Sequence, residues 1–261
     1  MYFPSELEKI IGRLPFTINT TGLSGSKVLC FEDMVLKIET ESEESNQEQD
    51  MMMWLADKLP VPRVLYSKTE NGISYLLMSM IDGKMSCDED FMKKPRALIE
   101  SLAKGLKMLW SVSIVDCPYD NPLDSKLKFA EYRVLNNLCN TEDAEPETYG
   151  SNGFRSPKDL LSWLKRNRPV ENVTFTHGDY CLPNIFLQGG EISGFIDLGG
   201  SGIADQYQDI ALCYRSLKHN FSGKYGGKQY PDADPDRLFD ELGIMPDWEK
   251  IKYYILLDEL F

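Results

Sequence analysis

Short apolar runs separated by polar turns fill the first 80 residues, a pattern typical of strands rather than of long helices. Val28–Phe31 and Val35–Ile38 are two such runs with a turn between them, so they predict a hairpin. A second hairpin is predicted where Arg63–Tyr66 and Ile73–Ser79 flank the turn residues Glu70–Gly72. The N-terminal part of the chain is therefore expected to form a β-sheet.

One helix is predicted between these two hairpins. Ser45, with Glu48 three residues later, matches a capping box, and the helix would run through about Leu59. The segment Pro60–Pro62 would end it, because proline cannot continue a helix. The acidic stretch Glu39–Asp50 is then interpreted as an exposed first turn, where carboxylates stabilise the helix N-terminus.

The C-terminal part of the chain follows a helical rhythm instead. Arg96–Val112 carries leucines three or four residues apart, Ser156 with a following proline is a typical helix start, and Asp247–Leu257 is a last helical run. Ile81–Gly83 resembles a hinge between the two patterns. We therefore expect an α+β organisation, with a small β-rich N-terminal lobe (1–79), a hinge (80–83) and a larger, mainly helical C-terminal lobe (84–261).

The charge balance narrows the choice of partners. The 261 residues include 28 Lys and Arg against 41 Asp and Glu, which gives a net charge of −13. Such a chain repels phosphate backbones and anionic lipids, so we expect no nucleic acid and no membrane as a partner. The same charge would attract a cationic ligand.

The distribution of apolar residues and cysteines bears on the compartment. No run approaches 18 apolar residues, and the first residues hold neither a basic region nor an apolar core, so neither a transmembrane helix nor a signal peptide is expected. Six dispersed cysteines without a C-x-x-C spacing, together with only two histidines, exclude a zinc finger and indicate reduced thiols. We therefore expect a cytoplasmic protein.

Residues 173–197 carry the most informative pattern. The strand Val173–Thr176 leads into His-Gly followed by Asp179, and Asn184 comes five residues later. A hairpin predicted over residues 185–196 ends at Asp197. Three oxygen-bearing side chains are thus expected to meet at the mouths of adjoining strands.

These three residue types suit phosphoryl transfer. Asn184 and Asp197 offer oxygen ligands for Mg²⁺, which usually keeps waters and nucleotide phosphates as well, and Asp179 stays free to orient a substrate hydroxyl. Kinases divide these roles between H-R-D-x-x-x-x-N and D-F-G, and this chain reads H-G-D-Y-C-L-P-N and D-L-G. Asp and Asn also cap turns, which would explain any one of them alone. The three together favour kinase chemistry in a protein-kinase-like, two-lobe fold.

The N-terminal lobe supplies the remaining parts of a nucleotide site. Lys37 lies inside an apolar strand and needs a counter-charge, which Glu48 on the next helix would provide while Lys37 points at the α- and β-phosphates. The small-residue turn that contains Ser24 would cover phosphates with backbone N–H groups. No G-x-x-x-x-G-K-[ST] sequence occurs, which excludes a P-loop kinase.

Further residues receive a structural or a substrate-binding interpretation. Asp209 is expected to brace the Asp179 loop as a buried acceptor, with helix-dipole stabilisation as the alternative. His177 has no partner at metal spacing, so its expected role is structural. In the acidic loop between residues 139 and 154, Glu145 and Glu147 are candidates for contacts with a cationic substrate.

The sequence as a whole resembles the aminoglycoside 3'-phosphotransferases, antibiotic-resistance kinases with a protein-kinase-like fold. The matching stretches span nearly the whole chain, and they are Asp50–Leu55, Leu59–Pro62, Leu76–Ser79, Asp116–Tyr119, His177–Asn184, Ser193–Asp197 and Pro246–Phe261.

The resemblance implies ATP, or GTP, with Mg²⁺ as cofactors and the 3'-hydroxyl of kanamycin- or neomycin-like sugars as the acceptor. It implies that Asp179 is catalytic, that Asn184 and Asp197 hold Mg²⁺, and that the pair of Lys37 and Glu48 positions the phosphates. By the same resemblance, the nucleotide also meets Ser24 and the backbone from Ser79 to Ile81, and substrate ammonium groups meet Glu259 and the carboxylate of Phe261. We expect a monomer or a weak dimer.

The sequence departs from the family pattern at several positions. Gly200 stands where relatives tend to have Arg, His219 and Asn220 stand where an acidic pair would help hold the drug, and Val35 replaces an aromatic beside adenine. A basic, glycine-rich stretch opens the segment 222–235, whose role the pattern does not indicate. Two alternatives therefore stay open: a kinase of the same fold for another small hydroxylated amine or sugar, and a nucleotide-binding pseudokinase.

Overall fold

The computed structural model describes residues 3–19, 26–142 and 144–261. Its N-terminal part is an antiparallel sheet in the order β1-β2-β3-β5-β4. The strands are β1 (Thr17–Asn19), β2 (Lys27–Cys30), β3 (Met34–Thr40), β4 (Val64–Glu70) and β5 (Ile73–Ser79). Both hairpins expected from the sequence are confirmed. The register pairs Lys37 in the central strand β3 with Leu76 of β5, which fixes its position within the sheet.

Helix α2 (Glu43–Leu55) connects β3 to β4, and a short helix α1 (Ser5–Ile11) precedes the sheet. The expected capping box at Ser45 and Glu48 is wrong. Ser42 is the N-cap: its Oγ accepts a hydrogen bond from the backbone N–H of Ser45, and the Ser42 backbone N–H donates to the Ser45 Oγ. Glu48 does not cap the helix because its carboxylate is paired with Lys37. The helix therefore begins earlier than expected and ends at Leu55, four residues before Leu59.

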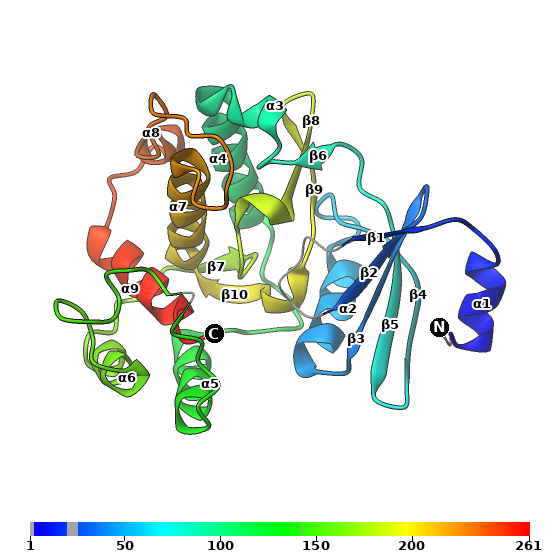
Figure 1. Ribbon diagram of the computed structural model, residues 1–261, viewed down its shortest axis with the longest axis horizontal. Coiled ribbons are helices and arrows are strands. Elements are labelled where there is room, and N and C mark those ends of the chain that lie inside the picture. Colours follow the sequence, from blue (N-terminus) through cyan, green and yellow to red (C-terminus); the bar gives the residue numbers. More distant parts are fainter. Residues whose placement is uncertain (1–2, 20–25, 143) are drawn as a thin grey trace.

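The C-terminal part is mainly helical and lies beside the sheet (Figure 1). Its helices are α3 (Glu89–Met92), α4 (Pro95–Ser111), α5 (Leu123–Leu135), α6 (Pro157–Arg166), α7 (Gln206–Ser222), α8 (Arg237–Leu242) and α9 (Trp248–Asp258). The helices expected near residues 96–112, after Ser156 and near 247–257 are confirmed, and so is the α+β class. The lobe boundaries at 79 and 84 stay a prediction.

Two small sheets carry the loops of interest between these helices. β7 (Val173–Thr176) pairs with β10 (Gly202–Asp205), and β6 (Lys84–Met85) pairs with β8 (Ile185–Gln188), which in turn pairs with β9 (Glu191–Phe195). Short 3₁₀ turns, η1 (Leu182–Asn184) and η2 (Leu198–Gly200), follow the segments that contain Asp179 and Asp197.

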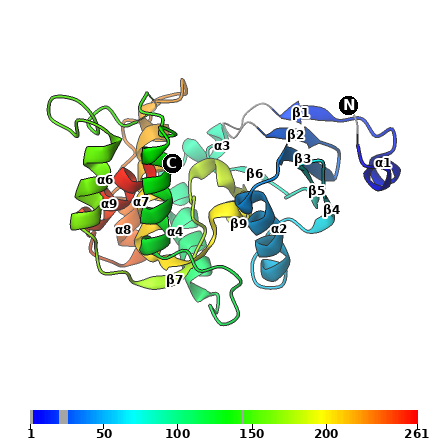
Figure 2. The same cartoon turned by 90° about the horizontal axis from the view of Figure 1, so that it is seen from below.

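The packing joins α2 to the helical part of the molecule. Its buried residues Met51, Met52 and Leu55 belong to the large core built by the C-terminal helices. Trp54 of α2 lies against Phe175 of β7, with ring centroids 5.5 Å apart and ring planes tilted by 47°. A separate, smaller core lies between α1 and the other side of the sheet. Figure 2 shows α2 between the sheet and β9, so Glu48 is held on the side of the sheet that faces the C-terminal part.

Within the described residues, no helix is long and apolar enough to cross a membrane.

Candidate active site

The loop between β7 and η1 presents Asp179 to a cavity of about 770 Å³. The side-chain amide of Asn184 donates hydrogen bonds to the Asp179 carboxylate (2.8 Å) and to its carbonyl oxygen (3.0 Å). Asp179 is exposed to the cavity, but the surrounding protein atoms displace part of its hydration and raise its pKa to about 6, with further increases from the charges of Asp258 and Asp197. A carboxyl group with this pKa is suited to accept a proton near neutral pH.

Asp209 of α7 binds the backbone of the loop that carries Asp179. Its carboxylate is fully buried and accepts hydrogen bonds from the backbone N–H groups of His177 (2.7 Å) and Gly178 (2.9 Å). Gln208 adds a hydrogen bond from its side-chain amide to the Gly178 carbonyl (2.7 Å). The expectation that Asp209 braces the Asp179 loop is confirmed, because its two oxygens fix two successive peptide groups before the catalytic position.

Gly178 is required at its position for a steric reason. Its φ is +90°, and a Cβ built there would lie 2.0 Å from the carbonyl oxygen of Gly200. By contrast, a Cβ on Gly200 would meet only atoms of Gly178, at 3.7 Å or more. Gly200 therefore leaves room for a side chain, whereas Gly178 does not.

His177 is fully buried between Tyr180 and Phe195. Its Nδ1 accepts a hydrogen bond from the backbone N–H of Asp179 (3.3 Å), and burial lowers the pKa of the ring. A neutral histidine that orders the start of the loop agrees with the structural role expected from the sequence.

Lys37 reaches across from β3 into the same region. Its Nζ lies 2.7 Å from Glu48 Oε2, 3.4 Å from Asp197 Oδ1 and 3.5 Å from Glu39 Oε1. Burial acts to lower the pKa of Lys37, but the three carboxylates outweigh it and raise the pKa, so the ammonium stays charged. Burial raises the pKa of Glu48 to about 7, although Lys37 opposes this shift. The Lys37–Glu48 pair expected from the sequence is therefore present.

Asp197 follows β9 in a left-handed conformation, with φ at +60°. Two residues later, Gly199 lies close to Glu44 of α2, because a Cβ built on Gly199 would be 2.6 Å from the Cγ of Glu44. The side chain of Asp197 is 46% exposed, which leaves its second oxygen open to the cavity.

The donor set at this point fits Mg²⁺ with a bound nucleotide. The Asn184 amide nitrogen is used by Asp179, so its side-chain oxygen stays available, and Asp197 adds a carboxylate. The backbone N–H of Ile196 donates to the Asn184 carbonyl (3.0 Å), which keeps the two segments adjacent. Mg²⁺ at nucleotide sites usually takes its other ligands from phosphates and water. Across the described residues no group of three or more His, Cys, Asp or Glu side chains could hold a metal ion.

The segment from Ser79 to Asp82 connects the sheet to the C-terminal part. Ser79 exchanges hydrogen bonds with the backbone of Arg63, and the N–H of Met80 donates to the Asp33 carbonyl (2.9 Å). The N–H of Ile81 donates to no backbone carbonyl among the described residues. Ser24, the expected phosphate-loop residue, lies outside the described residues.

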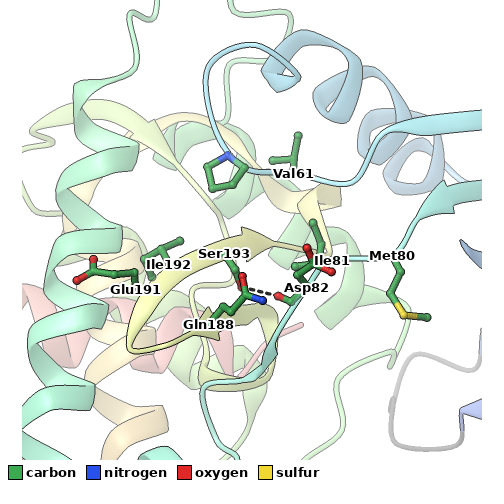
Figure 3. Close-up of a pocket in the computed structure, with 9 residues that line it drawn as sticks. Val61, Met80, Ile81, Asp82, Gln188, Glu191, Ile192 and Ser193 are labelled. Carbon is green, nitrogen blue, oxygen red and sulfur yellow. Dashed lines mark hydrogen bonds between the residues drawn. The ribbon is translucent and has the colours of Figure 1, made fainter. Parts of the chain in front are cut away.

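A second cavity, of about 390 Å³, lies beside this connection (Figure 3). Ser193 Oγ of β9 donates a hydrogen bond to the Asp82 carbonyl (2.6 Å), and Val61 and Ile81 line the same space. A Cβ on Gly194 would lie 2.5 Å from the Ile81 side chain. The β8–β9 hairpin thus packs closely against one side of the segment from Ser79 to Asp82.

The expected substrate residues are only partly gathered at the large cavity. Phe261 and Asp258 line it together with Asp179, whereas Glu145, Glu147 and Glu259 do not. Glu259 is buried and accepts hydrogen bonds from the backbone N–H of Glu145 (3.1 and 3.3 Å). Glu145 itself pairs with His219 and Lys224, and Glu147 is exposed at the surface.

The structure adds wall residues that the sequence interpretation missed. Tyr254, Leu257 and Asp258 line the cavity from α9, next to the expected Phe261, and Ser125, Lys126, Phe129 and Arg133 line it from α5. Both sets follow i, i+3 or i, i+4 spacing, so each forms one helix face. That periodicity was the signal that could have found them. Glu43 and Glu44 line the opposite side from the start of α2.

Comparisons with known proteins agree with this geometry. The APH family, described as the phosphotransferase enzyme family, matches residues 18–254. An aminoglycoside 3'-phosphotransferase of Enterococcus faecalis is 42% identical over 100% of this chain and 99% of its own length. A protein of the same name from Staphylococcus aureus is 41% identical over the same shares.

A solved structure shares the fold over nearly the whole length. The aminoglycoside phosphotransferase APH(3'')-Id of Streptomyces rimosus superposes with a TM-score of 0.83 at 25% identity, covering 97% of this chain and 95% of that one. Its complex with ADP and streptomycin superposes with a TM-score of 0.78 at 24% identity, over the same shares.

Proposed function

The chain belongs to the phosphotransferase enzyme family, and we propose that it is an antibiotic-resistance kinase that transfers the γ-phosphoryl group of ATP to the 3'-hydroxyl of an aminoglycoside. One observation carries the chemical part of this proposal. Asp179, held by Asn184 at 2.8 Å, shares a cavity with Asp197, whose carboxylate contacts Lys37. The names of the relatives support the choice of the 3'-hydroxyl.

Asp179 is the residue that receives the acceptor hydroxyl. Its carboxylate orients the hydroxyl toward the γ-phosphoryl group and accepts its proton as the new bond forms. Asn184 fixes the rotamer of Asp179, and Asp209 fixes the loop backbone before it. Positioning of this kind is the main catalytic requirement for phosphoryl transfer, because the reaction needs little covalent participation from the enzyme.

The nucleotide binds at Lys37 and the segment from Ser79 to Ile81, which lie outside the lining of this cavity. Lys37, oriented by Glu48, contacts the α- and β-phosphates, and the backbone from Ser79 to Ile81 contacts adenine. Ser24 would cover the phosphates. Asn184 and Asp197 would hold Mg²⁺, which would supply positive charge next to the transferring phosphoryl group. ATP is the expected donor, and competition by GTP for ATP-dependent turnover measures the preference.

The substrate enters a cavity with a mixed lining. Asp258, Glu43 and Glu44 lie in its wall and supply negative charge for the ammonium groups of an aminoglycoside. Phe261 lines the same cavity as Asp258, and its backbone N–H donates a hydrogen bond to the Asp258 carbonyl (3.0 Å). Glu145, Glu147 and Glu259 lie outside this wall.

The compartment and the assembly state complete the proposal. All six cysteines are unpaired, which suits the reducing cytoplasm where ATP is supplied. We expect a monomer or a weak dimer, and sedimentation velocity over a range of concentrations measures this.

The deciding experiment follows phosphate transfer directly. Purified protein with ATP and Mg²⁺ is expected to phosphorylate a kanamycin-like aminoglycoside, and nuclear magnetic resonance of the product is expected to place the phosphate on the 3'-oxygen. A 3'-deoxy analogue is expected to remain unmodified, and Asp179→Asn is the matched inactive control. Phosphorylation at another position, or nucleotide binding without any turnover, contradicts the proposal.

The cavity wall also favours a second candidate, a kinase for another small hydroxylated amine or sugar. Lys126 and Arg133 place two cationic side chains in a wall that would face a polycation. A substrate with fewer ammonium groups would suit this lining better. A coupled ATPase assay with a panel of amino sugars and hydroxylated amines distinguishes the two candidate functions. Only the class of compound that is the enzyme's substrate is expected to be turned over at low concentration.

A further inference from the structure

A cluster of charged side chains lies at the C-terminal end of α7, outside the wall of the large cavity. Glu145 Oε1 lies 2.7 Å from His219 Nε2 and 2.8 Å from Lys224 Nζ. Lys224 Nζ is also 3.2 Å from His219 Nε2, and the other ring nitrogen of His219 is 2.9 Å from the Tyr225 hydroxyl. One carboxylate oxygen thus contacts both an ammonium and an imidazole.

The surroundings keep Glu145 ionised. Its burial acts to raise the pKa, but Lys224, His219 and Arg215 outweigh this effect and lower the pKa of Glu145. Burial lowers the pKa of His219, so the ring is mainly neutral at mildly alkaline pH and Lys224 is then the cation paired with Glu145. The side chains of Glu145 and Lys224 are 28% and 36% exposed, so an incoming ligand can reach the pair.

The cluster is connected to the substrate side of the cavity. The backbone N–H of Glu145 is bound by Glu259, whose neighbour Asp258 lines the cavity and pairs with Arg215. The acidic loop between residues 139 and 154 is therefore attached to the C-terminal end of α9, beside the place where the substrate ammonium groups are expected. The chain's own cations already occupy two carboxylates at this end, Glu145 and Asp258.

We propose that Lys224 is a specificity-determining residue, because it occupies Glu145 in the way that a substrate ammonium group would. This inference rests on the proposed aminoglycoside kinase function. A substrate that extends an ammonium group to Glu145 binds there only by displacing Lys224, so this lysine weakens the binding of the more highly charged substrates. A half-exposed ion pair is weak, and its displacement therefore changes affinity without preventing binding.

The test compares two aminoglycosides that share the ring with the 3'-hydroxyl and differ in the number of amino groups on their other rings. KM is measured at pH 8, where His219 is neutral, for the wild type, Lys224→Met and Lys228→Met. Lys228 comes from the same segment and pairs with Glu89 of α3, so Lys228→Met removes the same charge at a different place. The matched control removes the general effect of net charge from the comparison.

Lys224→Met is expected to lower KM for the more highly charged substrate about twofold to fivefold, with kcat unchanged. The less charged substrate and the Lys228→Met variant are expected to show no such change. Adding Glu145→Gln to Lys224→Met is expected to abolish the gain. An unchanged or increased KM in Lys224→Met overturns the inference, as does a gain that survives Glu145→Gln.

Failure of the proposed function gives a different result. If the wild type phosphorylates neither aminoglycoside, the function is wrong, whatever the variants do. Dissociation constants of the same two compounds, measured by calorimetry for the wild type and Lys224→Met, then test the role of Lys224 without any turnover. Equal constants for the wild type and Lys224→Met, with thermal unfolding unchanged, overturn the inference independently of turnover.

Discussion

The side-chain amide of Asn184 donates a 2.8 Å hydrogen bond to the Asp179 carboxylate, and one side chain thereby serves two neighbouring sites. Its nitrogen holds Asp179, the residue proposed to receive the acceptor hydroxyl, which leaves its oxygen available to a metal ion. The five-residue spacing makes this possible, because the 3₁₀ turn Leu182–Asn184 folds the chain back toward Asp179. The proton acceptor and the proposed Mg²⁺ site are consequently positioned by a single contact.

The acid side of the pH–rate profile is expected to report Asp179. Because its pKa is raised to about 6, kcat/KM is expected to be flat above pH 7 and to fall about tenfold per pH unit well below pH 6. The amino groups of the substrate stay protonated on this side, so the fall belongs to the enzyme. Asn184→Asp places a second carboxylate beside Asp179 and is expected to move the fall to higher pH. A wild-type profile that stays flat down to pH 4.5 would contradict this assignment.

The same pKa predicts a stability change in the absence of ligands. A carboxyl group whose folded-state pKa is raised contributes stability that is present below pH 4 and is lost as the pH rises through about 6. Asp179→Asn removes this titration while keeping the shape of the side chain. The variant is therefore expected to unfold with about 1 kcal/mol more free energy than the wild type at pH 7.5, after allowance for solvent screening, and with no difference at pH 3.5. Urea denaturation at the two pH values measures this, and a difference that does not change with pH speaks against it.

Two glycines with the same φ separate backbone strain from steric contact. Gly178 and Gly190 both have φ at +90°, but a Cβ on Gly190 meets nothing within 4 Å, whereas one on Gly178 collides with the Gly200 carbonyl. Gly190→Ala is expected to cost about 1–2 kcal/mol of unfolding free energy and to leave kcat intact. Gly178→Ala is expected to cost more and to lower kcat at least 100-fold, because the Asp179 loop must shift away from Gly200. Equal kcat values for the two variants would show that this contact does not position the loop.

Local patterns in the sequence were sufficient for much of the fold. The hairpins around residues 31–34 and 70–73 and the helix after Ser156 depend on turn residues, caps and apolar spacing, which neighbours in the sequence determine. The start of α2 could not be found in this way. Ser45 and Glu48 have the right spacing for a capping box, but a lysine on β3 takes the glutamate, and the sequence does not display such a contact.

The candidate site shows the same division between local and distant information. Asp179, Asn184 and Asp197 lie within 19 residues of one another, so a motif could predict them together. The sequence shows that residues 145 and 259 are acidic, but it does not show whether a cation of the same chain is paired with them. Only the fold brings Lys224 to Glu145. Lys126 and Arg133 were missed for a related reason: the helix face that they share points into the cavity only because the fold brings α5 to the C-terminal end of α9, where Arg133 donates to the Leu260 carbonyl.

The buried pair of Lys37 and Glu48 predicts a pH-dependent cost of mutation. Lys37→Met leaves Glu48 buried without its nearest cation, so its pKa is expected to rise above the value of about 7 that it has in the wild type. The folded variant then binds more protons than the unfolded chain between about pH 4.5 and pH 8, so its stability falls as the pH rises through this range. We expect a cost of about 3–5 kcal/mol at pH 8 and a smaller one at pH 5, where Glu48 is neutral.

A double-mutant cycle with Glu48→Gln separates this pair from its surroundings. Lys37→Met together with Glu48→Gln is expected to be more stable at pH 8 than Lys37→Met alone, because no unpaired carboxylate is left buried. Each of the three variants is expected to raise the KM for ATP, since the phosphates lose either the Lys37 ammonium or its orientation. Urea denaturation at pH 5 and pH 8 and initial rates at varied ATP concentration provide the measurements. If Lys37→Met loses the same stability at both pH values, Glu48 does not titrate as the structure requires. Its burial beside Lys37 then does not determine how the stability depends on pH.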